Sequence, residues 1–502
     1  MLAPPPALRV SMLEHDTPLI NASRYGRLAD VKALLSSGVD LNEPKTDGSG
    51  ASALYIASQE GHADVVSALL AAGAETNAGS GTSALYIASQ EGHADVVSAL
   101  LAAGAEADRA GADGRTPLLI ASIEGHVAVV AALLAKGARA DVVPAGPPEE
   151  LTPLFAASLQ GHVKVMVALL EAGAQVDMAA PDGFAPLLLA SQEGHVEAVT
   201  ALLAAGANVE GVRSDGATPI FSAAMHGNAK VVSVLLAAGA EVDSIFHDED
   251  DEDSTSTPLF MACYEGHADV VALLLLAGAS VNWCGNQGQT TPLMATCQQG
   301  HREVASVLLA AGAAVNQADH QGRTAMSLGC GNGHFACVQI LSSYGAVRTF
   351  QSPEGEVTAE QGADFHGHEA LTSWLVESRQ WSTPLHHLRI IGASRAHDLL
   401  RDGANIHAAA AAGGPTPLSL AQALRVAGNP EAAEGSAASL VLAAAELWGP
   451  RTHDLFPTAA RDFAVELLLI GHQLSRQPRF AGEEIALVDV WTQLVMPNAV
   501  VR

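Results

Sequence analysis

The 502-residue sequence contains few aromatic residues, few charged residues and little positive charge. Aromatic residues make up 4%, so a folded core must be filled mainly by Ala, Leu and Val. Charged residues make up 16%, against roughly 25% in ordinary soluble domains. There are 25 Lys and Arg but 54 Asp and Glu, which gives a formal net charge of −29. This acidity argues against nucleic acid or an anionic membrane as a partner and favours a protein partner whose charged segment, if it has one, is basic.

Segments that would direct the chain to another compartment are also missing. No uninterrupted apolar run reaches the 18 or so residues of a membrane-spanning helix. The first residues, Met1 to Arg9, lack the apolar stretch of a signal peptide. The five cysteines form no C-x-x-C pair, unlike a secreted disulfide framework. We therefore expect a cytoplasmic or nuclear protein without membrane insertion, and we favour a monomer.

One repeating unit fills most of the chain. The segment SALYIASQEGHADVVSALLAAGAE at residues 52–75 recurs unchanged at residues 83–106. Most units read T-P-L-x-x-A-x-x-x-G-H-x-x-V-V-x-x-L-L-x-x-G-A, and they begin at Thr17, Ser52, Ser83, Thr116, Thr152, Ala185, Thr218, Thr257, Thr291 and Thr324. The period of about 33 residues and the T-P-L opening closely resemble the ankyrin repeat. The resemblance implies an all-α ankyrin-repeat solenoid, a curved array of helix-turn-helix units with β-hairpin fingers and a helical C-terminal cap.

The chemistry of each unit supports two short helices. Thr116 is a good N-cap, and Pro117 suits the first helical turn. Gly125 and His126 separate the first helix from the second, whose Val and Leu recur at helical spacing. Gly137 then stands where a left-handed C-terminal cap is needed. Because two helices cannot bury a core alone, neighbouring units must stack.

The repeat pattern weakens after Ala346, and the sequence predicts four regions. An N-terminal tail (1–16) precedes ten ankyrin repeats (17–346), degenerate ankyrin-like repeats (347–446) and a C-terminal helical cap or extension (447–502). Within the degenerate region Thr383 opens a unit soon after Thr358, so the intervening finger is expected to be lost.

The residues that could carry chemistry occupy repeated slots. Nine histidines share the position after the repeat glycine, and stacked units would hold them too far apart for a metal: His62, His93, His126, His162, His195, His267, His301, His334 and His368. Cys263, Cys297 and Cys330 also share one slot and read as small buried residues. No nucleotide-binding, metalloprotease or hydrolase motif is present. We predict no catalytic, cofactor-binding or metal-binding residues, no cofactor and no enzymatic activity.

The ankyrin resemblance implies a partner surface on the concave face, where the fingers and first helices lie. The predicted partner-binding set consists of the polar residues late in the first helices, nearby aromatics and an acidic finger: Tyr55, Gln59, Glu60, Tyr86, Gln90, Glu91, Glu124, Gln160, Phe184, Gln192, Glu193, Asp248, Asp250, Asp251, Tyr264 and Glu265. The alternative is that these groups only keep helices and a loop solvated. The acidic run lacks the Gly and Glu that an EF-hand calcium loop requires.

The sequence thus predicts a non-catalytic protein–protein interaction scaffold. The alternative is a substrate-recruiting adaptor of a ubiquitin ligase, with the C-terminal helices docking the ligase. The last lysine in the chain is Lys230, which suits that alternative, but no F-box or SOCS-box pattern follows Leu447. A hidden catalytic domain is disfavoured, because roughly 55 residues outside the repeats are too few for one.

Overall fold

The computed structural model describes residues 16–45, 50–77, 82–142, 151–247, 255–284, 289–352, 355–381, 383–402, 404–410, 414–427 and 429–445. Three predicted features lie outside these ranges. They are the N-terminal tail except for its last residue, the acidic finger with Asp248, Asp250 and Asp251, and the cap at 447–502. The chain divides into two compact units, residues 1–261 with 276–279 and residues 262–275 with 280–502.

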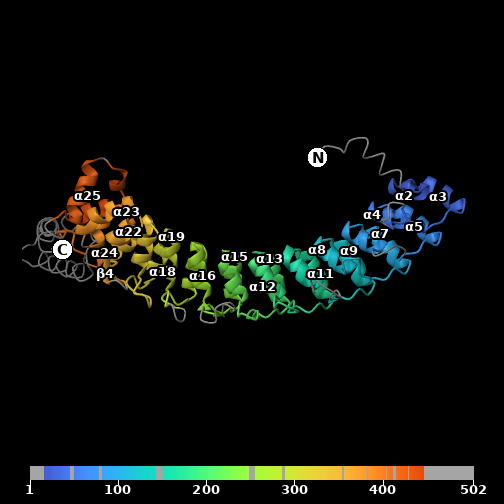
Figure 1. Cartoon of the computed structure of the whole chain (residues 1–502), viewed down its shortest axis with the longest axis horizontal. Helices are drawn as coiled ribbons and strands as arrows, with labels where there is room; N and C mark the ends of the chain where they lie inside the picture. The colour runs from blue at the N-terminus through green and yellow to red at the C-terminus, as the bar shows by residue number, and fades with distance from the viewer. Residues whose placement is uncertain are drawn as a thin grey trace, which may run out of the picture. The chain divides into compact units, whose positions relative to one another are not determined.

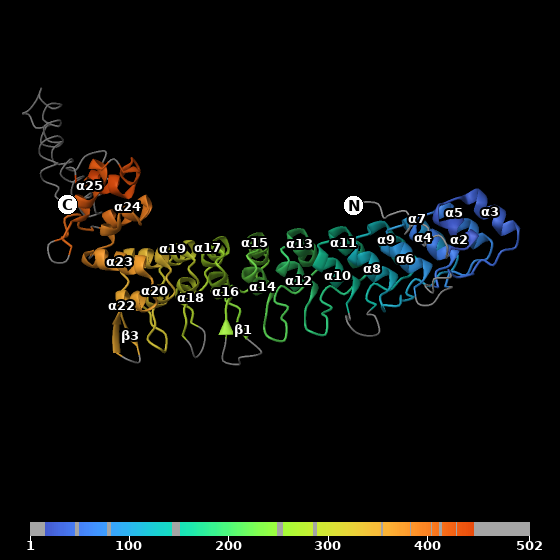
Figure 2. The ribbon, with the colours of Figure 1, turned by 45° about the horizontal axis from the view of Figure 1, so that its top comes forward.

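The first unit consists of pairs of antiparallel helices. Its elements are α2 (Pro18–Arg24), α3 (Leu28–Ser36), α4 (Ala53–Gln59), α5 (Ala63–Ala71), α6 (Ala84–Gln90), α7 (Ala94–Ala102), α8 (Pro117–Ile123), α9 (Val127–Ala135), α10 (Pro153–Gln160), α11 (Val163–Glu171), α12 (Pro186–Gln192), α13 (Val196–Ala204), α14 (Pro219–Met225), α15 (Ala229–Ala237), β1 (Phe246–His247) and β2 (Thr255–Ser256). First helices pack on first helices, second helices on second helices, and the connecting fingers lie on the first-helix side (Figures 1 and 2). We call that side the first-helix face.

The first helices begin where the sequence predicts. The Thr116 hydroxyl accepts a hydrogen bond from the Leu119 N–H at 3.2 Å, and Pro117 occupies the first turn. The same cap recurs at Thr152 and Thr218. Gly137 has a φ of +89°, the left-handed conformation in which a residue with a Cβ is strained. Local chemistry therefore sets both ends of the helix pair.

The core lies between the two helix layers. Val129, Val130 and Leu133 on α9 have no exposed surface, and Leu202 on α13 is equally buried, as predicted. The finger that contains β1 packs on the first-helix layer as well. The rings of Phe221 on α14 and Phe246 on β1 stack with centroids 4.6 Å apart.

The second unit continues the pattern and then departs from it. Its elements are α17 (Ala268–Leu276), α18 (Pro292–Gln299), α19 (Arg302–Ala310), α20 (Ala325–Gly331), α21 (Phe335–Ser343), β3 (Thr349–Ser352), β4 (Gly355–Thr358), α22 (Ala359–Phe365), α23 (Glu369–Glu377), η1 (Ser378–Gln380), η2 (Pro384–His387), α24 (Ala393–Arg401), α25 (Pro417–Val426), η4 (Pro430–Ala432) and α26 (Ala437–Ala444), and α16 (Pro258–Glu265) spans the division between the units. Strands β3 and β4 pair antiparallel, with Phe350 opposite Val357, and form the finger that precedes α22 (Figure 2).

The chain after α23 forms a helical module with its own core. The described residues between α23 and η2 contain only the short turn η1. Leu385, Leu400, Leu424 and Val441, from η2, α24, α25 and α26, meet in one buried apolar cluster. The mostly helical architecture confirms the predicted all-α solenoid. None of the helices in the described ranges has the length and apolarity needed to cross a bilayer.

Candidate functional site

The repeated histidines connect neighbouring repeats through the backbone. His93 Nε2 donates to the Gln59 carbonyl at 3.0 Å, and His126 Nε2 donates to the Gln90 carbonyl at the same distance. Equivalent bonds are made by His62, His162, His195, His301, His334 and His368. Because the acceptor is a carbonyl oxygen, the ring proton lies on Nε2. This nitrogen is used in a hydrogen bond between repeats and cannot bind a metal. The predicted structural role is therefore confirmed at these positions.

The histidine bonds also hold the predicted partner surface in place. Each acceptor carbonyl belongs to a residue at the end of a first helix, and those of Gln59, Gln90 and Ile123 directly precede an acidic residue. A Cβ added at Gly61 would lie 2.6 Å from the His93 ring, so only glycine allows the ring to approach. The ends of α4, α6 and α8 are thus fixed by the histidine of the next repeat, whereas Asn228 donates to the Gln192 carbonyl at the end of α12.

Acidic side chains at these helix ends are exposed. Glu91, Glu124 and Glu193 are exposed, as are Gln160 and Glu265, whereas Gln59, Gln90 and Gln192 are half-buried. We call Glu91, Glu124 and Glu193 the acidic strip. Among the ion pairs in the described part of the chain, none involves these three carboxylates. Their negative charge is available to a partner.

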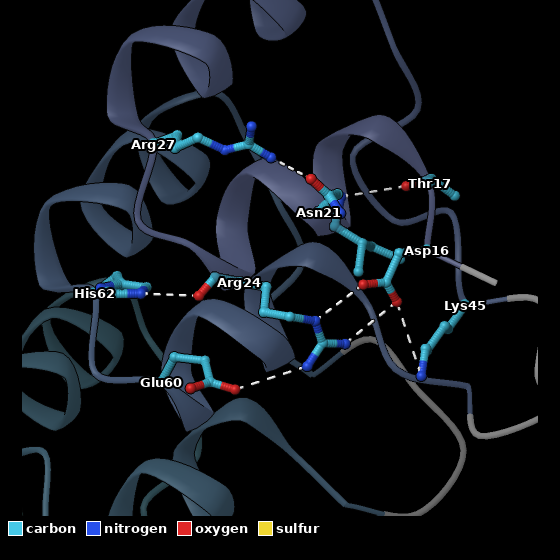
Figure 3. Close-up of polar contacts among 9 residues, drawn as sticks. Asp16, Thr17, Asn21, Arg24, Arg27, Lys45, Glu60 and His62 are labelled. Carbon is cyan, nitrogen blue, oxygen red and sulfur yellow. Dashed lines mark hydrogen bonds and ion pairs between the residues drawn. The ribbon is translucent and has the colours of Figure 1, made fainter. Parts of the chain in front are cut away.

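The first repeat differs, because Glu60 has a cationic neighbour. Arg24 Nη1 lies 3.7 Å from the Glu60 carboxylate (Figure 3). Arg24 also donates from Nε to the Asp16 carboxylate at 2.9 Å, and Lys45 Nζ lies 3.8 Å from the same group, which has no exposed side-chain surface. The hydrogen bond to Asp16 is the main reason why the pKa of Arg24 is raised. Glu60 is exposed as predicted, but part of its charge is balanced within the chain.

The predicted aromatic anchors fall into different environments. Tyr55 is half-buried, and its burial raises the pKa of its hydroxyl. The negative charge of Glu91 in the next repeat raises this pKa further. Phe184 is also half-buried, with the Arg213 guanidinium carbon 4.8 Å from its ring centroid. Tyr264 is 40% exposed. Tyr55 and Tyr264 therefore keep aromatic surface that a partner can contact.

The prediction that Tyr86 is an exposed anchor is wrong. Only 5% of its surface is exposed, and its hydroxyl donates to Asp113 in the following finger at 2.6 Å. Burial, followed by this hydrogen bond, raises the pKa of the Tyr86 hydroxyl far above its ordinary value. The finger covers the ring, which the sequence alone does not reveal.

The cysteines behave as packing residues. Cys263, Cys297 and Cys330 have no exposed surface and carry free thiols, as their small-residue slot predicts. Burial raises the pKa of the Cys330 thiol to about 12, which keeps it protonated at neutral pH. Within the described ranges no group of three or more His, Cys, Asp or Glu side chains is arranged to hold a metal ion.

An aromatic cluster formed by α23 and the start of the C-terminal module was not foreseen from the sequence. The ring of Trp381 lies edge-to-face with His387 at 5.0 Å and with Trp374 at 6.1 Å between centroids. His386 instead bonds to the residue before its helix, with Nδ1 2.8 Å from the Thr383 hydroxyl. The only hint in the sequence is that Trp374 and Trp381 stand close together in a chain with few aromatics.

Comparison with known proteins agrees with this architecture. The family model described as ankyrin repeats (3 copies) matches residues 6–80, 75–144, 142–213, 210–283 and 259–351. No curated protein matches the chain. Among solved structures, the crystal structure of the human ASB11 ankyrin repeat domain is 27% identical, with a TM-score of 0.40, and the match covers 45% of this chain and 97% of that one. Since the family model accounts for well over half of the sequence, this chain belongs to the ankyrin-repeat family.

Proposed function

We propose that this protein is a non-catalytic interaction scaffold that binds a protein partner through its first-helix face. Ankyrin repeats are protein-interaction domains, which supports the general role. The observation that carries the more specific proposal is the acidic strip. Glu91, Glu124 and Glu193 recur at one structural position and have no ion-pair partner among the described residues. A partner segment rich in Lys or Arg would be complementary to it.

The strip is suited to guide association rather than to supply most of the affinity. Exposed carboxylates are screened over about 8 Å at physiological ionic strength, so their attraction weakens as salt rises. Charges at the rim of an interface mainly set the association rate and orientation. Affinity would rest on contacts with aromatic surface such as that of Tyr55 in the same unit, because anchoring residues at interfaces are often aromatic.

The test compares two triple variants of the full chain. Partners are first captured by proximity labelling in cells, and their association is then followed with purified protein at several salt concentrations. Replacing Glu91, Glu124 and Glu193 by Gln should slow association severalfold at low salt and reduce its salt dependence.

The matched control carries the same number of Glu-to-Gln changes away from the first helices. Glu106, Glu171 and Glu197 are exposed and lie on second helices or directly after one. The control should leave association nearly unchanged. Equal effects of both triple variants, or association that is insensitive to salt, would exclude the acidic strip as the binding surface.

A ubiquitin-ligase adaptor is the second candidate function. The distribution of lysines favours it, because a chain without lysines after Lys230 offers few sites for its own ubiquitination. The segment proposed to dock the ligase, residues 447–502, lies outside the described residues. Affinity purification of the full chain should recover ligase subunits. If ligase subunits are consistently absent, the adaptor function is excluded and only the scaffold function remains.

A further inference from the structure

A cavity of about 470 Å³ opens in the C-terminal module of the second unit. Its walls come from α21, α23, η2 and α25 and from the segments after α23 and η2. Residues lining it include Gln339, Trp374, Glu377, Trp381, Arg389 and Leu424. The cavity is separate from the acidic strip, which lies on first helices of the other unit.

Two tryptophans form an aromatic corner of this cavity. The ring planes of Trp374 and Trp381 meet at 88°. The guanidinium carbon of Arg348 lies 5.5 Å from the centroid of Trp374, and its amino groups donate to the Leu375 carbonyl and the Ser378 hydroxyl, each at 3.0 Å. One aromatic ring of the corner therefore already holds a cation from the chain itself.

Two charged side chains line the cavity, Glu377 and Arg389, and of these only Glu377 has no ion pair among the described residues. The Arg348 cation on the Trp374 ring is not part of this lining. The carboxylate of Glu377 is exposed, and no ion pair of the described residues involves it. Arg389 also lines the cavity, but its Nε lies 3.1 Å from Glu431, which balances its charge. The ring nitrogens of His386 contact Thr383 and the Pro415 carbonyl, and burial lowers its pKa, so this histidine is neutral near pH 7.

The remaining walls are aliphatic. They consist of Leu388, Ile390, Leu420, Ala423, Leu424 and Ala427. A ligand that fits must therefore have an apolar stem and a positive head. Lysine and arginine side chains have this construction, since their methylene groups pack on apolar surface while the charged end stays polar. The face of a tryptophan ring attracts such a head.

We propose that this cavity binds a lysine or arginine side chain of a protein partner. The stem lies along Leu420 and Leu424, and the head lies between Trp381 and Glu377. An anionic ligand would have to compete with Glu431 for Arg389, and a neutral apolar ligand would leave Glu377 without a partner. This second contact site is independent of the proposed strip.

The first experiment uses short capped peptides, Ala-Ala-X-Ala-Ala, with X as lysine, arginine or norleucine. Full-length protein labelled with ¹⁵N in its five tryptophans reports binding through the indole signals. The lysine and arginine peptides should shift the signals of Trp374 and Trp381, identified by single Trp-to-Phe variants. Norleucine, which has the stem without the charge, should bind about fivefold more weakly. No shift at these two indoles, or equal binding of norleucine, would overturn the proposal.

The second experiment tests the carboxylate with a matched pair of variants. Glu377→Gln should weaken binding of the lysine peptide about two- to fivefold, the range expected for an exposed ion pair. Glu369→Gln changes an exposed glutamate on the same helix that does not line the cavity, and it should have less than about a twofold effect. Equal effects would overturn the proposal. Partner association that depends on the acidic strip but not on Glu377 would leave the proposed function intact.

Discussion

Histidines that follow the repeat glycines keep Nε2 on a backbone carbonyl of the preceding repeat, whereas His387 is enclosed in the C-terminal module. Its Nδ1 is buried without a hydrogen-bond partner among the described residues, beside the rings of Trp374 and Trp381. Burial is the main cause that lowers the pKa of His387 to about 3, with the nearby charge of Arg348 adding to it. One residue type is thus a structural donor in one place and a buried neutral ring in another.

His387 should make the second unit sensitive to acid. An unfolded histidine binds its proton near pH 6.5, and the folded one does so only near pH 3, so between these values only the unfolded chain is protonated. Stability should therefore fall as pH decreases, by up to about 2 kcal/mol between pH 6.5 and 5. His387→Phe should reduce this loss in denaturant unfolding at several pH values, whereas His407→Gln, at an exposed site, should not. An unchanged pH dependence in His387→Phe would contradict the assignment.

At the scale of the element, the turn between α8 and α9 contains a glycine that meets two requirements, a left-handed backbone and a close approach of the next repeat. Gly125 has a φ of +78°, and a Cβ there would lie 2.8 Å from the His162 ring. Gly137 ends the second helix with a φ of +89°, but no atom of the described part of the chain lies within 4 Å of the position that a Cβ would take there. Gly137 is thus required only for its left-handed backbone, whereas Gly125 is required both for its backbone and for the close approach of His162.

Substituting alanine at these two glycines should give unequal losses. Gly137→Ala introduces only the left-handed conformation, at a cost of about 1–2 kcal/mol. Gly125→Ala adds the clash with His162 and weakens its bond to the Ile123 carbonyl, which should cost about 1 kcal/mol more. Urea unfolding of the two variants measures the difference. Equal losses would show that the histidine contact contributes little.

At the scale of the whole molecule, repeats contact only their neighbours, so stability is distributed along the chain. The second helices pack pairwise, as α7 does on α9 and α9 on α11. The C-terminal module has a separate apolar cluster. A defect in one repeat is therefore expected to stay near that repeat.

Leu133→Ala tests this locality. Leu133 has no exposed surface, so the cavity left by the substitution should cost about 2–5 kcal/mol in its repeat. Hydrogen exchange should increase in α8 and α9 and in their neighbours but not in α24–α26. Leu276→Ala, at a site that is 86% exposed, is the control and should change exchange little. Uniform acceleration along the chain would indicate a single cooperative unit instead.

The sequence determined the repeat fold because its signals are local. Thr116, Pro117, Gly125 and Gly137 fix helix ends within a few residues of themselves, and the Val and Leu spacing marks the buried face. The exposure of the acidic strip followed from the same periodicity. The neighbours of each side chain could not be predicted in this way.

Only the tertiary structure decided which predicted residues remain available to a partner. Asp113 comes from the next finger to cover Tyr86, and Arg24 comes from the preceding repeat to balance Glu60. The cavity beside Trp381 is formed by segments from α21 to α25, far apart in the sequence. Each of these outcomes depends on contacts between different repeats or helices, and a repeating pattern specifies the slot of a residue but not the side chain that meets it across the interface.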